Sequence, residues 1–191
     1  MFRCPLYNKP NNKNDLQLYS SSLENGFTNQ YLHNKNGMTP KLEWKSDPRA
    51  KSYILVFIDE WAFSQKASPQ SGSSAERKPS KTSLKDNNWA HNWRHWILLN
   101  IPANVNSLPS VKVSETKNPV WNGIIQGRNS WNEYGYGGPD PPRGSGPHKY
   151  CFYIYALDTE LKAENNSENL LNKLEDHILS CGFFYRMYEN I

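Results

Sequence analysis

The segment GYGGPDPPRGSGPHKY, residues 135–150, constrains the fold more than any other part of the chain. It holds five glycines and four prolines in sixteen positions. Proline lacks the amide donor that helices and central strands need, and glycine in either element is entropically costly. The segment is therefore predicted to be a constrained loop, and the apolar run that follows it has the composition of a β-strand.

Strands dominate the rest of the prediction. Segments 52–59, 95–101 and 150–157 are short, rich in β-branched and aromatic residues, and bounded by turn formers. Segment 52–59 is almost continuously apolar, which is typical of a strand buried on both faces. Three weaker candidates follow the same rules: a short strand at 121–127, a half-exposed edge at 41–44 and a last strand at 183–188.

One helix is predicted, over residues 168–180. Leu170, Leu171, Leu174 and Ile178 fall on one stripe of such a helix. Ser167 is placed to cap its N-terminus, and Gly182 lies where a residue of left-handed conformation would end it. The predicted class is mainly β with a peripheral C-terminal helix.

The length of 191 residues indicates a single domain spanning 1–191. Residues 64–88 contain seven serines, four lysines and no aromatic residue, so we expect a disordered surface insertion there. Residues 1–14 are expected to be a loose N-terminus for similar reasons. No apolar stretch approaches the length that crosses a bilayer, so no transmembrane segment is predicted.

Charge and cysteine content limit the function classes. The formal charge of +4 is spread along the chain without a basic block, so nucleic acid is not an expected partner. Cys4, Cys151 and Cys181 form neither an even set nor a C-x-x-C pair. We therefore expect reduced thiols, no structural metal and a cytoplasmic location.

Candidate binding residues lie at the ends of the strongest strands. Asp59 closes the first strand, His95 opens the second, and His148 with Tyr150 opens the third. If the second and third strands both run antiparallel to the first, these side chains meet at one rim of the sheet. The glycine- and proline-rich loop would lie over that rim.

Such a rim suits a small anion. Glycine allows the backbone to turn successive N–H groups inward, and a concavity of N–H groups binds phosphate or sulfate oxygens. Imidazole and phenol groups add further donors. Asp59 repels an anion directly, but it can accept a hydrogen bond from a histidine and hold the imidazolium towards the ligand.

Other chemistries receive less support from the residues. His91 and His95 have the i, i+4 spacing of zinc ligands on a helix, but the aromatic strand composition around them argues against a helix. Ser145 stands in Gly-Ser-Gly without the strand-turn-helix context of a nucleophile. A metal-dependent enzyme therefore remains the less favoured alternative.

Four longer motifs extend the comparison to a known family. The chain contains YILVFIDEWA, NWRHWILLNIPANVNSLP, GIIQGRNSWNEYGYGGPDPPRGSGPHKYCFYIYALD and a closing GFFYRMY. In these motifs it resembles the phosphatidylethanolamine-binding protein family, also known as the Raf kinase inhibitor protein family, and in particular its bacterial-type branch. The resemblance runs from about Phe27 to Tyr188.

The resemblance implies a β fold in which a central antiparallel or mixed sheet packs on a smaller second sheet. It also implies a small anion pocket for phosphate esters such as the phosphoethanolamine head group, without a catalytic cycle or cofactor. The pocket motif of the family maps onto six ligand-binding positions: Asp59, Trp93, His95, Gly138, His148 and Tyr150. Asp140, in the loop between them, is a seventh candidate ligand-binding residue.

Two departures from the family pattern bear on that pocket. The family's Asp-Pro-Asp-Ala-Pro is replaced by Asp-Glu-Trp-Ala-Phe at 59–63, so Trp61 and Phe63 change the turn after Asp59. Asp140 adds a negative charge where the family has cysteine or a small residue. The expected function is a non-catalytic phosphate-ester or phospholipid head-group binding protein. The alternative is a signalling protein that inhibits a protein kinase or another enzyme.

Overall fold

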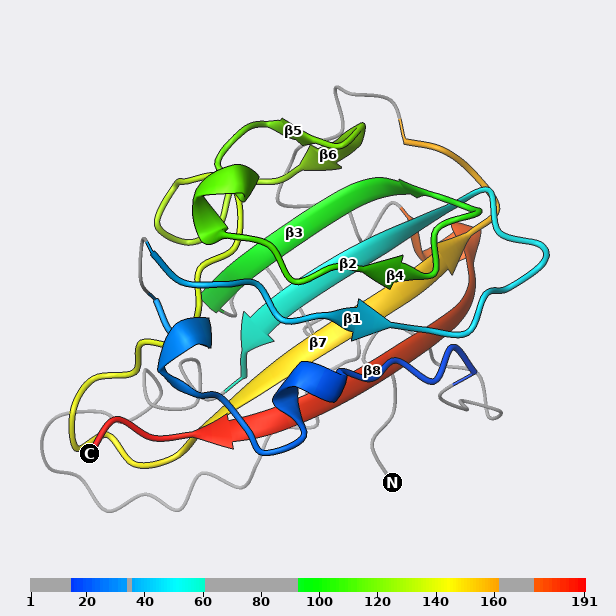
Figure 1. Ribbon diagram of the computed structural model, residues 1–191. Helices are drawn as coiled ribbons and strands as arrows, with labels where there is room; N and C mark the ends of the chain where they lie inside the picture. Colours follow the sequence, from blue (N-terminus) through cyan, green and yellow to red (C-terminus); the bar gives the residue numbers. More distant parts are fainter. Residues whose placement is uncertain (1–14, 34–35, 61–92, 162–173) are drawn as a thin grey trace, which may run out of the picture.

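The computed structural model describes residues 15–33, 36–60, 93–161 and 174–191. The predicted loose N-terminus at 1–14 and the predicted disordered insertion at 64–88 lie outside these residues, as do Trp61, Phe63 and His91. Figure 1 shows a long, twisted sheet with a short second sheet lying across one of its faces.

The large sheet has six strands in the order β5-β6-β3-β2-β7-β8, and every neighbouring pair is antiparallel. The small sheet pairs β1 with β4. The strands span Leu42–Glu43 (β1), Ser52–Asp59 (β2), Trp93–Pro102 (β3), Ser107–Leu108 (β4), Val120–Trp121 (β5), Ile124–Gln126 (β6), His148–Leu157 (β7) and Ile178–Tyr188 (β8). Single 3-10 turns lie at Ser21–Leu23, Asn29–Tyr31, Val113–Thr116 and Glu175–His177. The predicted mainly β architecture with a smaller second sheet is confirmed.

Strand β2 occupies the centre of the sheet because both of its faces are apolar. All eight of its residues are buried, as the continuous apolar run predicts. Tyr53, Leu55 and Phe57 face the small sheet and belong to one hydrophobic core. Ile54, Val56 and Ile58 face a second core on the opposite side of the sheet.

The predicted C-terminal helix is wrong in the part that the structure describes. Residues 162–173 lie outside the described ranges, Glu175–His177 form one 3-10 turn, and Ile178 already begins β8. Gly182 pairs with Ile154 inside that strand and therefore caps no helix. Strand β7 pairs with ten of the eleven residues of β8, with one register shift near the start of β8, and this long-range pairing overrides the local helical spacing of the leucines.

The prediction of one strand at 121–127 is also corrected. Val120–Trp121 and Ile124–Gln126 are the two strands of a hairpin. Asn122 and Gly123 form the turn between them with φ values of 49° and 80°. An Asn-Gly pair adopts these positive φ values readily, and they match the twist of a two-residue hairpin.

The cysteines do not all match the expectation of reduced thiols. Cys151 is free and buried in the second core. Cys181, which is buried in β8, is disulfide-bonded. The expectation that every thiol is reduced is therefore wrong.

Candidate functional site

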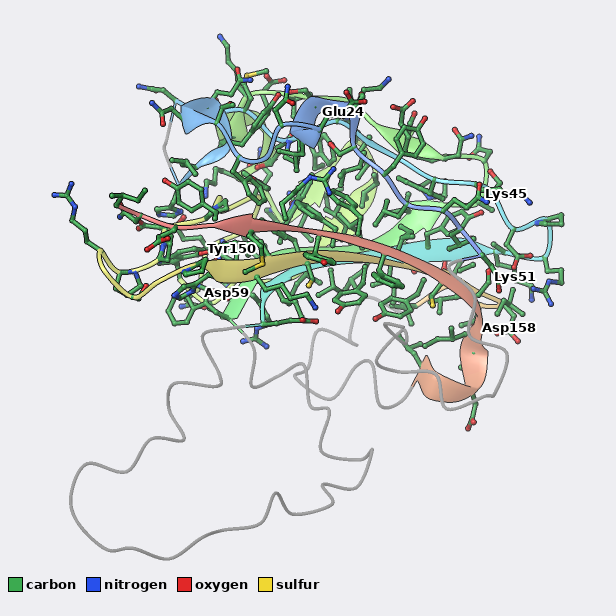
Figure 2. The ribbon with its side chains drawn as sticks, turned by 90° about the horizontal axis from the view of Figure 1, so that it is seen from below. Glu24, Lys45, Lys51, Asp59, Tyr150 and Asp158 are labelled. Carbon is green, nitrogen blue, oxygen red and sulfur yellow. The ribbon has the colours of Figure 1, made fainter. Side chains whose placement is uncertain are left out.

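Antiparallel pairing brings the predicted rim together as the sequence analysis expects. Asp59 at the end of β2 lies opposite Trp93 on one side and opposite Tyr150 on the other. His148, two residues before Tyr150, is on the same face of β7. Figure 2 shows Asp59 and Tyr150 side by side at one end of the sheet, with Lys51 and Asp158 at the far end.

A β-bulge delivers His95 to the same face. Phe57 pairs with Trp96 and Ile58 pairs with Arg94, so His95 is an extra residue in β3. In a regular strand successive side chains alternate between the two faces of the sheet, so His95 and Trp96 would lie on opposite faces. Instead, the His95 ring lies 5.0 Å from the ring of Phe57 and 5.2 Å from that of Tyr150.

The centre of the site is a buried pair formed by Asp59 and His148. Asp59 is 4% exposed and His148 is also 4% exposed. Nδ1 of His148 lies 2.6 Å from Oδ2 of Asp59, and its Nε2 lies 2.9 Å from Oγ of Ser145. The Ser145 hydroxyl donates its one proton to the carbonyl of Pro142 at 2.6 Å, so its oxygen accepts from His148. Both imidazole nitrogens therefore act as donors to oxygen atoms of the protein.

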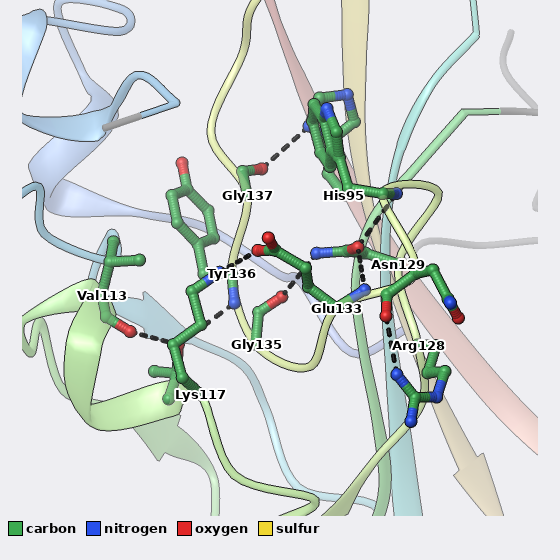
Figure 3. Close-up of polar contacts among 12 residues, drawn as sticks. His95, Val113, Lys117, Arg128, Asn129, Glu133, Gly135, Tyr136 and Gly137 are labelled. Atoms are coloured by element: carbon green, nitrogen blue, oxygen red, sulfur yellow. Dashed lines mark hydrogen bonds and ion pairs between the residues drawn. The ribbon is translucent and has the colours of Figure 1, made fainter. Parts of the chain in front are cut away.

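His95 differs from His148, because only one of its ring nitrogens is hydrogen-bonded to the described residues. Its Nδ1 donates to the carbonyl of Gly137 at 2.8 Å (Figure 3) and to the carbonyl of Gly138 at 3.0 Å. Its Nε2 is buried and has no hydrogen-bond partner among the described residues. Burial lowers the pKa of His95 to about 4, against the opposing effects of these carbonyls and of the Asp59 charge. At neutral pH His95 thus offers a buried acceptor at Nε2.

Tyr150 separates the two histidines and is fully buried. Its ring centroid lies 6.2 Å from that of His148. Burial raises the pKa of its hydroxyl above the usual value for a phenol, and the nearby Asp59 carboxylate acts in the same direction. The backbone of Asp140 lies near this hydroxyl, while the side chain of Asp140 is exposed.

The loop at 135–147 contributes carbonyl groups rather than the expected row of N–H groups. The Gly137 N–H donates to the backbone carbonyl of His95 at 2.9 Å, and the carbonyls of Gly137 and Gly138 receive the proton of His95. Gly138 is also needed for space, because a Cβ there would lie 2.1 Å from the carbonyl oxygen of Tyr31. The hydrogen bonds of His95 with Gly137 and Gly138 thus hold the loop against the rim of the sheet.

Sequence reasoning missed Trp131 and Ser145 as parts of this site. The Trp131 ring packs edge-on against His95 at 5.1 Å and against Trp93 at 5.4 Å. No local spacing signals this contact, because Trp131 arrives from the long loop after β6. Glu60, by contrast, points away: it pairs with Lys149 at 2.7 Å and with the hydroxyl of Tyr153 on the other face of the sheet.

No metal centre is evident in the part of the chain that the structure describes, where no three His, Cys, Asp or Glu side chains are placed to share an ion. None of the helical segments described there has the length and apolar composition needed to span a bilayer.

Comparison with known proteins identifies the class to which this fold and site belong. A family model described as phosphatidylethanolamine-binding protein matches residues 11–184. The chain belongs to the phosphatidylethanolamine-binding protein family. Its relatives place it in the bacterial and archaeal UPF0098 branch of that family.

Two relatives illustrate the match. A UPF0098 protein of Methanothermobacter thermautotrophicus is 32% identical over 153 residues, which cover 78% of this chain and 82% of that protein. A UPF0098 protein of Pyrococcus horikoshii is 42% identical over 99 residues, or 50% of this chain and 48% of the relative. The match therefore spans about half the length of this second relative.

Solved structures agree on the fold. The crystal structure of Escherichia coli YbcL, a member of the mammalian PEBP family, superposes with a TM-score of 0.66 at 24% identity, covering 93% of this chain and 99% of YbcL. A putative homologue from Chlamydia trachomatis gives a TM-score of 0.58 at 25% identity, over 94% of this chain and all of that one.

Proposed function

We propose that this protein is a non-catalytic binding protein for small phosphate esters, such as the phosphoethanolamine head group of a phospholipid. The observation that carries the proposal is the buried Asp59–His148 pair, whose outer nitrogen already donates to a hydroxyl oxygen. A phosphate oxygen is a stronger acceptor than the oxygen of Ser145 and would replace it at Nε2 of His148. Membership of a family named for phosphatidylethanolamine binding supports the same ligand class.

His95 makes the proposed ligand more specific, because its Nε2 is an acceptor, whereas the sequence predicted a donor at this position. A fully ionised phosphate would place a negative oxygen against the Nε2 lone pair, which is unfavourable. A singly protonated phosphate ester carries one P–O–H group that can donate to Nε2 while its other oxygens accept from His148. The proposed ligand is therefore the monoanion of a phosphate monoester. An ammonium or hydroxyl group of a head group could make the same contact with His95.

The role as an inhibitor of a protein kinase or another enzyme stays an alternative proposal. The metal-dependent enzyme and the cytoplasmic location likewise stay predictions. Proton NMR separates the ligand classes, because phosphoethanolamine should shift the His148 imidazole resonances at pH 6, whereas a metal site would respond to zinc instead.

Replacing His148 by alanine should weaken phosphoethanolamine binding by about ten- to hundredfold, since it removes a charge-assisted donor worth about 1–3 kcal/mol. Calorimetric titration at pH 6 measures the change. His177→Ala is the matched control, because His177 is exposed and hydrogen-bonded to Asp158 outside the site. An affinity of His148→Ala equal to that of the control would remove His148 from the binding site.

Ser145→Ala should have the opposite effect and tighten phosphoethanolamine binding by a few-fold. The ligand then no longer has to displace the hydroxyl oxygen that accepts from His148. The same titration tests this, with Ser107→Ala, an exposed serine of β4, as control. Weaker binding by Ser145→Ala would mean that the hydroxyl contacts the ligand rather than competes with it.

A further inference from the structure

A cavity that is partly open to solvent lies outside the candidate site. Its volume is about 770 Å³, and its described lining comes from the 3-10 turn at Val113–Thr116, the following Lys117, the loop at 128–136 and His33. None of the candidate residues Asp59, His95, His148 or Tyr150 lines it. Its volume falls in the range of sites that hold small molecules, typically about 300–1,000 Å³.

The walls of this cavity are fixed before any ligand arrives. The buried side chain of Asn129 accepts from the N–H groups of Trp131 and Glu133 and donates to the carbonyl of Gly135 (Figure 3). Thr116, also buried, donates to Val113 and accepts from the N–H of Tyr136. These bonds hold loop and turn in one arrangement, so binding need not order them.

Two cationic side chains, Lys117 and Arg128, line the cavity, and only Lys117 is paired with a carboxylate of a described residue. Lys117 pairs with Glu133 at 2.9 Å. Arg128 donates through Nη1 to the carbonyl of Asn132 at 2.6 Å and lies 4.5 Å above the ring of Tyr134. Arg128 makes no other hydrogen bond, ion pair or ring contact with the described residues, so its other guanidinium N–H groups remain available to a ligand.

Further donors and flat rings surround that guanidinium. The hydroxyls of Ser114 and Tyr134 line the cavity and make no hydrogen bond to a described residue. His33 stacks on Trp131 with centroids 4.3 Å apart and planes inclined by 14°. The cavity thus combines an unneutralised guanidinium and hydroxyl donors with aromatic surface.

We propose that this cavity is a second binding site, for a small carboxylic acid with a planar apolar body. The carboxylate would pair with Arg128, and the ring would lie against Tyr134 and His33. A guanidinium matches the two oxygens of a carboxylate, and aromatic side chains favour a flat body. This assignment is independent of the proposed phosphate-ester site.

Phenylacetate is a suitable probe, because it joins a carboxylate to one ring. Titration into the ¹⁵N-labelled protein should shift amide resonances of 113–117 and 128–136. Arg128→Gln should weaken binding by at least about tenfold, the usual loss for a charge-assisted pair. Phenylacetamide, which has the same shape without the charge, should bind the wild type more weakly by a similar factor. Lys51→Gln removes a positive charge at the far end of the sheet and should leave the affinity unchanged (Figure 2).

Three outcomes would overturn the assignment. The first is the absence of shifts in 113–117 and 128–136 at millimolar phenylacetate. The second is equal affinity for phenylacetate and phenylacetamide, or an Arg128→Gln affinity equal to that of Lys51→Gln. The third is a set of shifts centred on Trp93, His148 and Tyr150, which would place the acid in the candidate site instead.

Discussion

Replacing Gly138 by alanine is expected to destabilise the protein by at least about 3 kcal/mol. A Cβ at this position would lie 2.1 Å from the carbonyl oxygen of Tyr31 and 2.3 Å from the carbonyl carbon of Leu32. Both are backbone atoms, which cannot turn aside as a flexible side chain does. Relief requires the loop and the segment at 31–33 to separate, which also strains the bond from His95 to the Gly138 carbonyl.

Urea unfolding measures this loss, and Gly144→Ala is the matched control. Gly144 has a φ of 75° but open space around a Cβ, so its alanine variant should lose only about 1 kcal/mol. A Gly138→Ala protein that fails to fold cooperatively agrees with the expectation. A Gly138→Ala midpoint equal to that of Gly144→Ala would show that the close approach of the two segments does not matter.

The strands that position the site could be predicted because their signals are local. The apolar run at 52–59 coincides with β2. Because the end of one antiparallel strand lies beside the start of its neighbour, Asp59 was correctly placed beside Tyr150 and Trp93. Only the hydrophobic pattern and the chain order are needed for this step. The resemblance to the family, now confirmed, rests on residues around these same strands.

What could not be predicted depends on pairing and packing at a distance. The bulge at His95 is a property of how β3 pairs with β2, and nothing in the sequence WRHW distinguishes it from regular alternation. The helix predicted to reach Ser180 was wrong because β7 supplies backbone partners from Ile178 onwards. A row of loop N–H groups was expected to face the site, but Nδ1 of His95 donates to the carbonyls of Gly137 and Gly138, so these two residues present acceptors there.

The protonation of His95 leads to a second large effect, on stability as a function of pH. In the folded protein burial lowers the pKa of His95 to about 4, whereas the unfolded chain has the ordinary value of 6.5. Between these two values the unfolded chain binds a proton that the folded protein excludes. The contribution of His95 to the free energy of unfolding is therefore fully present above pH 6.5. It is lost as the pH falls towards 4, by about 3 kcal/mol in total.

Unfolding by urea at pH 7 and at pH 4 should show this loss in the wild type and not in His95→Gln. Glutamine keeps amide donors near the carbonyls of Gly137 and Gly138 but does not titrate, so the variant should lose about 3 kcal/mol less than the wild type over the same interval. The direct check is an NMR titration, in which the chemical shifts of the His95 imidazole should remain those of the neutral ring down to pH 5. A His95 pKa near 6.5 in the folded protein, or equal losses for the two proteins, would contradict a buried neutral acceptor and with it the preference for a singly protonated phosphate ester.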